Sequence, residues 1–197
     1  WVYNGLNNSG DWVTKALDLQ GYRLDYVKGI STDWLYNFLN YGAMSGKFAV
    51  GEYFDLNLSS VNYWINTMMS GRSSAFDFPL RDYLKGMCNS PATFNMATLD
   101  HAGLAGTNPS KAVTFVENHD TDRSDAIYQN KALAYAYILT SEGYPSVFYK
   151  DYSTDAGCYG MKTTIDNLMW VHEKLASGST TQRFKNNLVF VYERTGG

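Results

Sequence analysis

The chain has 197 residues, 45% of them hydrophobic, which is enough for one large domain with a sizeable core. Its net charge of -3 and pI near 5.5 provide no broad basic surface, and no apolar run reaches the roughly 18 residues of a membrane span. Nucleic acid and membrane are therefore not expected partners.

Short runs rich in β-branched and aromatic residues alternate with segments of helical pattern. We predict strands at 21–27, 47–54, 74–80, 112–119 and 144–149. Apolar spacing predicts helices after Ser31 and Thr32, either of which could cap the helix, over 130–140 and over 165–175. The run 188–192 is followed by RTGG, which predicts a strand entering a hairpin. This alternation of strands and helices indicates an α/β fold with a parallel sheet.

Three of the predicted strands carry a carboxylic acid near their end: Asp25, Glu52 and Asp120. In a parallel barrel the carboxyl ends of all strands open onto one face, where active sites are built. Acids that far apart in sequence can meet there and carry acid chemistry. The pattern therefore points to an enzyme.

The first two acids differ in their sequence surroundings. Strand alternation puts Arg23 and Asp25 on one face, and a guanidinium there would lower the pKa of the carboxyl group, as a nucleophile requires. Glu52 follows an apolar stripe, and partial desolvation would raise its pKa and suit a general acid. A structural ion pair and a solvated loop glutamate are the respective alternatives.

The third acid follows His119. Alternation puts Asp120 on a face with Asn118, while His119 points the other way unless the backbone turns. His-Asp pairs occur in metal sites, so a metal-dependent phosphohydrolase is an alternative, but three histidines in the whole chain give a multi-histidine cage little support. In the structural alternative, Asp120 and Asp122 cap the next helix.

Cysteine usage excludes a disulfide framework and a CxxC pair. The two cysteines are Cys88 and Cys158. One bridge between them and two unpaired buried thiols both remain open.

Taken together, these segments resemble the α-amylases of the family 13 glycoside hydrolases, in particular the bacterial liquefying type. GYRLDYVKG is similar to the nucleophile strand of that family, FAVGEYF to its acid/base strand and FVENHDT to its third-carboxylate strand, and the likeness covers nearly the whole chain. The resemblance implies a partial (β/α)8 TIM barrel, about the fourth to eighth strand-helix units, over 1–178. The start of a C-terminal antiparallel β domain would follow over 179–197.

The resemblance also implies an activity. A retaining hydrolase would cleave internal α-1,4-glucosidic bonds of starch by double displacement. Asp25 would be the nucleophile, Glu52 the acid/base, and Asp120 would bind hydroxyls of the distorted sugar ring. Further substrate contacts implied by the family are Arg23, which would also orient Asp25, His119, Lys28 and Tyr53.

Two positions depart from the family pattern. Gly29 stands where the liquefying enzymes have His, and its backbone carbonyl could serve the calcium ion that the family leads us to expect. Lys150 stands where a Gly is usual. A further cation could bind at acidic residues, although solvated surface charge is the other explanation. These acids are Asp122, Asp125 and Asp155.

The family further implies a secreted enzyme, monomeric when full length, because starch is too large to enter a cell. The first three barrel strands and the calcium-binding domain would lie outside this chain, so we expect the 197-residue piece alone to be inactive and poorly soluble. A transglycosidase or a maltogenic enzyme would keep the same three acids. A starch-binding relative that has lost catalysis is the alternative from another class.

Overall fold

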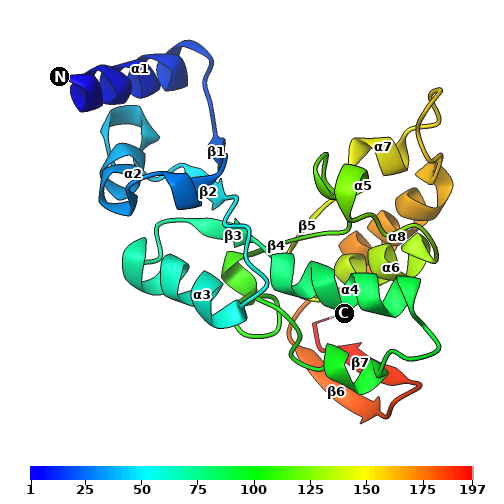
Figure 1. Ribbon diagram of the computed structural model, residues 1–197. Helices are drawn as coiled ribbons and strands as arrows, with labels where there is room; N and C mark the ends of the chain where they lie inside the picture. The colour runs from blue at the N-terminus through cyan, green and yellow to red at the C-terminus, as the bar shows by residue number, and fades with distance from the viewer. Residues whose placement is uncertain (197) are drawn as a thin grey trace. The chain divides into compact units, whose positions relative to one another are not determined.

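The computed structural model of the chain describes residues 1–196 (Figure 1). Short parallel strands alternate with helices, which confirms the predicted α/β class. The chain divides into two compact units, Trp1–Phe76 and Asp77–Gly197. The boundary expected between residues 178 and 179 stays a prediction.

Three parallel strands form the sheet of the first unit. They are β1 (Gly21–Leu24), β2 (Phe48–Gly51) and β3 (Ser74–Phe76), with β2 in the middle. The register sets Leu24 opposite Gly51, so Asp25 and Glu52 each follow the last residue of their strand. These strands are shorter than predicted because the backbone turns away, as at Tyr26, whose φ is 42°.

In the first unit, a capping residue fixes the start of one helix, and a glycine allows another helical segment to pack against the sheet. The helices are α1 (Val2–Ala16), α2 (Thr32–Leu39) and α3 (Leu58–Tyr63), and α3 continues as a π-helical turn, Trp64–Met68. Of the two predicted capping residues, Ser31 caps α2, since its hydroxyl accepts the Trp34 N–H, and Thr32 is the first residue of the helix. A Cβ on Gly51 would come within 2.3 Å of the Trp64 ring, so glycine lets this indole pack onto β2.

The second unit contains the parallel pair β4 (Ala112–Phe115) and β5 (Tyr144–Ser146). Its helices are α4 (Phe78–Asn89), α5 (Thr121–Ser124), α6 (Lys131–Thr140), α7 (Tyr149–Tyr152) and α8 (Lys162–Leu175). α6 packs against both α4 and α8, and its buried face includes Tyr135 and Ile138. The predicted helices at 130–140 and 165–175 are thus confirmed.

The predicted strands 112–119 and 144–149 are too long, since β4 ends at Phe115 and β5 ends at Ser146. A third predicted strand runs into a long helix. The run 74–80 was expected to be extended throughout, but β3 ends at Phe76 and α4 begins at Phe78. The Asp77 carboxylate accepts the Leu80 N–H at 2.9 Å, and Pro79 occupies the first turn of the helix. The cap and the proline therefore override the β preference of the aromatic residues.

The tail forms a hairpin, but not the predicted one. β6 (Thr180–Lys185) pairs antiparallel with β7 (Phe190–Arg194), so the partner strand precedes the run 188–192. The turn between them is held by Asn186, whose side-chain oxygen accepts the N–H groups of Leu188 and Val189 at 2.8 Å. The hairpin predicted at RTGG extends to residue 197, which lies outside the described residues.

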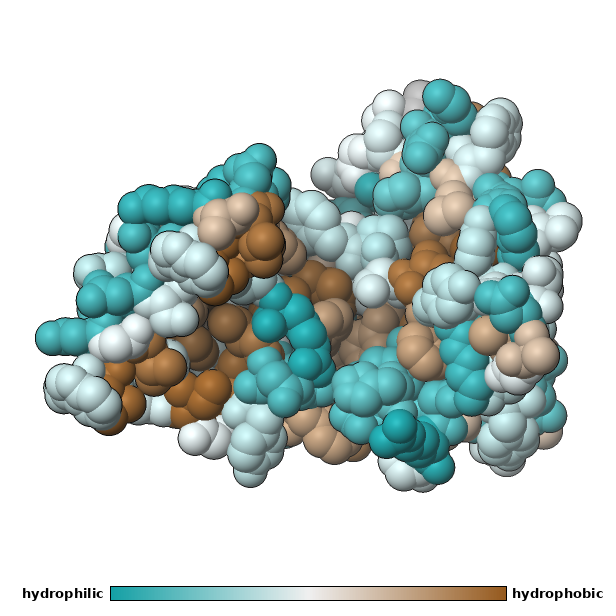
Figure 2. Space-filling model, turned by 90° about the horizontal axis from the view of Figure 1, so that it is seen from above, coloured by the Kyte–Doolittle hydropathy of each residue, from teal (hydrophilic) through white to brown (hydrophobic). Residues whose placement is uncertain are grey.

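Large apolar side chains reach the surface in both units, and many are visible in the space-filling view (Figure 2). Examples are Trp12, Phe54, Trp170 and Leu188. Within residues 1–196, no helix combines the length and the apolar character that spanning a membrane requires.

Candidate active site

Arg23 joins two of the three predicted acids. Its Nη1 lies 2.5 Å from Asp25 Oδ1 and its Nη2 lies 3.0 Å from Glu52 Oε1. The prediction that Arg23 and Asp25 are neighbours is confirmed. The contact with Glu52 was not foreseen, because it depends on how β1 and β2 are aligned.

The backbone fixes the two carboxyl groups relative to each other. The Glu52 N–H donates to the Leu24 carbonyl at 2.8 Å, and the Tyr26 N–H donates to Glu52 Oε2 at 3.1 Å. Both Glu52 oxygens therefore have partners, and its side chain is only 12% exposed. The Asp25 side chain is 74% exposed, so its carboxylate is accessible from solvent.

Lys28 and Tyr53, two predicted substrate contacts, lie close together. Lys28 Nζ lies 4.8 Å from the centre of the Tyr53 ring and 2.7 Å from Asp55 Oδ2. Tyr53 in turn stacks on Trp64, with ring centres 5.4 Å apart. Hydrogen bonds from Lys28 and from the Asn57 N–H hold the pKa of Asp55 below its usual value. Asp55 was missed because nothing near it in sequence indicates its partner.

Gly29 lies under the ring of Tyr26. A Cβ at this position would come within 2.4 Å of Tyr26 Cε1, so the tyrosine fills the space that a side chain at position 29 would need. Tyr26 can lie there because its backbone is left-handed. This gives a physical reason for glycine at a position where the liquefying enzymes have His.

The third acid belongs to the second unit. Asp120 directly precedes α5 and adopts helical backbone angles, so the strand alternation assumed from sequence stops before it. His119 Nε2 lies 3.4 Å from Asp120 Oδ2, and both side chains are exposed. The Asn118 side-chain oxygen accepts the N–H groups of Asp120 and Thr121 and thereby shapes the turn. The Asp120 side chain makes no capping hydrogen bond to α5, so the alternative in which Asp120 serves to cap this helix is not supported.

A buried acid beside this turn was missed. Glu117 accepts from Arg81 Nη2 at 3.1 Å, from the Thr121 hydroxyl at 2.5 Å and from the Ile127 N–H. Arg81 also contacts Asp125 at 2.5 Å. The cluster ties both ends of the segment 117–127, which carries His119 and Asp120, to α4. The one signal in the sequence is a charged residue directly after the apolar run of β4.

Lys150, the second departure from the family pattern, binds Asp122. Its Nζ lies 2.6 Å from Asp122 Oδ2, and the Tyr159 hydroxyl lies 2.8 Å from Asp122 Oδ1. Burial acts on the pKa of Asp122 in the opposite direction, but the hydrogen bonds from Lys150 and Tyr159 leave that pKa lowered. The loop 153–161 is thus fastened to α5, two residues from Asp120.

The acids considered as cation ligands do not fit a calcium site. Asp122 is 6% exposed and occupied by Lys150, so the solvated-charge explanation is wrong for it. Asp125 contacts Arg81 and Lys85, and Asp155 accepts from Ser153 and Tyr149. No three acidic, histidine or cysteine side chains gather as metal ligands in the described part of the chain. Calcium binding by the Gly29 carbonyl stays a prediction.

The two cysteines are both free, which settles the alternative left open by the sequence. Cys88 is buried on α4, and burial raises the pKa of its thiol to about 11. Cys158 lies half-buried in the loop after α7.

No family model matches the chain, but curated proteins do. The α-amylase of Geobacillus stearothermophilus is 35% identical over 99% of this chain and 37% of its own length. Glucan 1,4-alpha-maltohexaosidase of Bacillus sp. (strain 707) is 33% identical over 99% of this chain and 40% of its own length. The chain belongs to the α-amylase family. The resemblance stated from the motifs is thereby confirmed.

This α-amylase family member spans about 40% of the length of the curated relatives it matches. An α-amylase structure from Malbranchea cinnamomea aligns with a TM-score of 0.68 at 17% identity, over 97% of this chain and 46% of that one. The shared fold confirms the expected partial (β/α)8 barrel followed by a small antiparallel sheet.

Proposed function

We propose that this chain supplies the catalytic acids of a retaining glycoside hydrolase that cleaves internal α-1,4-glucosidic bonds of starch. The observation that carries the proposal is the contact of one guanidinium, that of Arg23, with both Asp25 and Glu52 at neighbouring strand ends. Retaining glycosidases need two carboxyl groups of different role at close range. The names of the curated relatives support an α-glucan as the substrate.

Double displacement assigns one role to each of these acids. The Asp25 carboxylate forms a bond to the anomeric carbon while the glycosidic C–O bond breaks, and protonated Glu52 gives its proton to the departing oxygen. Glu52 then takes a proton from water, whose oxygen attacks the same carbon and releases Asp25. Arg23 contacts both carboxyl groups and fixes their positions relative to each other. The accessible Asp25 and the half-buried Glu52 suit these two roles.

The other predicted residues would hold the sugar. Asp120 would accept hydrogen bonds from ring hydroxyls and His119 would bind the sugar being cleaved. Lys28 would contact the sugar on the leaving side, and after its bond to Asp55 its ammonium group still has two hydrogen atoms to donate. Tyr53 would offer a ring beside it. Convergence of the three acids on one sugar is part of this proposal.

The test uses the complete enzyme with Asp25→Asn or Glu52→Gln. We expect starch hydrolysis to fall roughly 10²- to 10⁴-fold in the Glu52 variant, the usual contribution of a general acid. Glu173→Gln, an exposed acid on α8, is the control and should retain activity. NMR of the first products should show the α-anomer. Full hydrolysis by either site variant would contradict the roles given to the two acids, whereas a wild-type enzyme without hydrolysis would favour a starch-binding relative that has lost catalysis.

A maltogenic enzyme or a transglycosidase is the second candidate, favoured by one relative that is named glucan 1,4-alpha-maltohexaosidase. Chromatography of early starch products distinguishes internal cleavage from a maltogenic enzyme and from a transglycosidase. Mixed oligosaccharides support internal cleavage, one dominant short product supports a maltogenic enzyme, and products longer than an added oligosaccharide support transfer.

We also propose a secreted monomer, to be checked by sedimentation of the enzyme from culture medium.

A further inference from the structure

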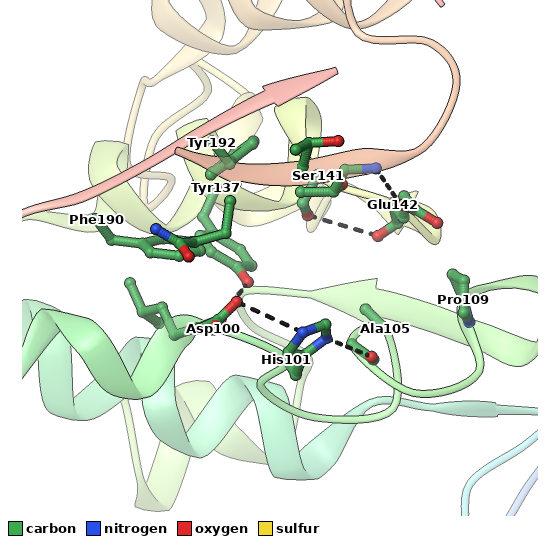
Figure 3. A pocket seen from close by; sticks show the side chains of 14 residues that line it. Asp100, His101, Ala105, Pro109, Tyr137, Ser141, Glu142, Phe190 and Tyr192 are labelled. Carbon is green, nitrogen blue, oxygen red and sulfur yellow. Dashed lines mark hydrogen bonds and ion pairs between the residues drawn. The ribbon is translucent and has the colours of Figure 1, made fainter. Parts of the chain in front are cut away.

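A cavity of about 470 Å³ lies in the second unit, between the loop 99–109 and the hairpin β6–β7 (Figure 3). Pro109, just before β4, and Glu142, just before β5, both line it. The cavity therefore opens at the amino ends of these strands, whereas Asp120 follows the carboxyl end of β4. Barrel enzymes build their active sites at the carboxyl ends. The cavity is thus separate from Asp120, the predicted catalytic acid of the same unit.

One wall of the cavity is aromatic. Figure 3 shows Tyr137, Phe190 and Tyr192 gathered on one side. The rings of Phe190 and Tyr192 lie 5.4 Å apart, and those of Tyr137 and Tyr192 lie 6.1 Å apart. The Tyr137 hydroxyl donates to the Leu99 carbonyl, and that of Tyr192 is hydrogen-bonded to Thr140. With both hydroxyls occupied, this wall offers mainly ring surface.

The opposite wall presents a strained histidine. His101 has a φ of 57°, which is unusual for a residue with a side chain, and its imidazole is 79% exposed. Its Nδ1 lies 3.3 Å from the Gly106 carbonyl, and a Cβ on Gly106 would come within 2.2 Å of the His101 backbone. This tight loop keeps the imidazole at the cavity without burying it. Such strain is concentrated at binding and catalytic sites.

The charges of the cavity favour a neutral ligand. Asp100 is paired with Lys185, and Glu142 Oε1 accepts the Thr180 N–H at 2.5 Å. A cation would need several oxygen ligands together, and residues 1–196 gather no such group of acidic or histidine side chains. An anion would find no lysine or arginine in the cavity lining, so the loss of its hydration would not be compensated. A hydroxyl-rich, uncharged molecule can accept and donate hydrogen bonds here at no such electrostatic cost.

We propose that this cavity is a second, non-catalytic binding site for a neutral sugar, such as a glucose unit of an α-glucan. A sugar ring has C–H groups on its faces and hydroxyls around its edge, which matches ring surface on one wall and His101, Asp100 and Gln182 around it. The volume lies in the usual range of roughly 300–1,000 Å³ for small-ligand sites. The choice of an α-glucan rests on the proposed function.

The test is a titration of the complete enzyme with maltose, followed by NMR at His101 and Gln182. Phe190→Leu keeps apolar volume but removes the flat ring, and should weaken maltose binding roughly two- to tenfold, the range for one aromatic contact. His101→Gly removes the imidazole and relieves the positive φ, so weaker binding by this variant cannot come from added strain. Phe184→Leu is the matched control, because Phe184 is an exposed phenylalanine of the same hairpin outside the cavity.

Maltose shifts at the cavity that weaken in Phe190→Leu and His101→Gly, but not in Phe184→Leu, would support the site. Absence of such shifts in the wild type, or equal affinity in all three variants, would overturn it. Stronger binding of calcium than of maltose at His101 would also overturn it. Starch hydrolysis is measured in a separate assay. If the proposed function fails in that assay, the maltose-binding result at the cavity can still be interpreted.

Discussion

Arg81 and Glu117 form an ion pair almost out of contact with solvent. Arg81 Nη2 lies 3.1 Å from Glu117 Oε2, and the two side chains are 3% and 0% exposed. Because Glu117 also binds Thr121 and Ile127, this pair connects α4 to both ends of the segment that carries Asp120. The position of one predicted catalytic acid thus depends on a buried charge pair outside the substrate contacts.

Removing one partner of this pair should destabilise the protein strongly. Arg81→Met leaves the Glu117 carboxylate buried without its cation, and we expect the free energy of unfolding to fall by about 3–5 kcal/mol. Arg183→Met removes a partner of Glu193 in a pair that is more than half exposed, where a loss below about 1 kcal/mol is expected. Urea denaturation of both variants checks the difference. Equal losses would contradict the role given to the buried pair.

Replacing Arg23 by lysine should impair catalysis more than stability. A single ammonium group cannot contact Asp25 and Glu52 in the way that the two Nη atoms do, so the carboxyl groups lose their common support. We expect kcat of the complete enzyme to fall roughly a hundredfold, the scale of a small misplacement of reacting groups. Arg183→Lys, far from the acids in sequence, serves as the control. An unchanged kcat for Arg23→Lys would refute the bridging role.

Asp77 should make stability depend on pH between about 4 and 6. Its carboxyl group is buried, and desolvation raises the pKa of Asp77 from 3.8 to about 6, although three backbone N–H groups act in the opposite direction. A raised pKa means that the folded state holds the proton longer than the unfolded state. Stability from Asp77 is therefore full below pH 3.8 and is lost as pH rises to about 6, by up to about 3 kcal/mol.

Asp77→Asn removes the titrating group and should flatten this part of the curve. The free energy of unfolding, measured in urea from pH 4 to pH 7 for the wild type and the variant, gives the comparison. Acids with lowered pKa values, such as Asp122, act at lower pH and are common to both proteins. A wild type that gains stability relative to the variant over this window would show that the sign is wrong.

Lys150 should control the order of the loop 153–161. Lys150→Met keeps the aliphatic stem but removes the bond to Asp122, so the Tyr159 N–H, which donates to the Lys150 carbonyl, should exchange with solvent roughly two- to fivefold faster. Lys162→Met is the matched control, since Lys162 also contacts an aspartate and a tyrosine, Asp166 on its own helix and Tyr152 on α7. Hydrogen exchange followed by NMR distinguishes them. Equal protection of the Tyr159 amide in wild type and Lys150→Met would argue against the fastening.

Much of the local structure could be predicted from sequence because it depends on neighbouring residues. Alternation along β1 places Arg23 beside Asp25, and the hydroxyl of Ser31 can only cap the helix that follows it. Where two local signals competed, the prediction failed. The aromatic run 74–80 favoured a strand, but Asp77 and Pro79 start a helix within it.

Contacts between distant segments were decided by the tertiary structure alone. Glu52 meets Arg23 because the register sets Leu24 opposite Gly51, and no spacing within either segment contains that alignment. Glu117 could be noticed as a charge after an apolar run, but its partner Arg81 lies 36 residues away on another element. The sequence by itself determined that Asp25 and Glu52 stand at strand ends, since side-chain period is local. Only packing of the strands and helices decided which cations they meet, since ion pairing depends on distance in space.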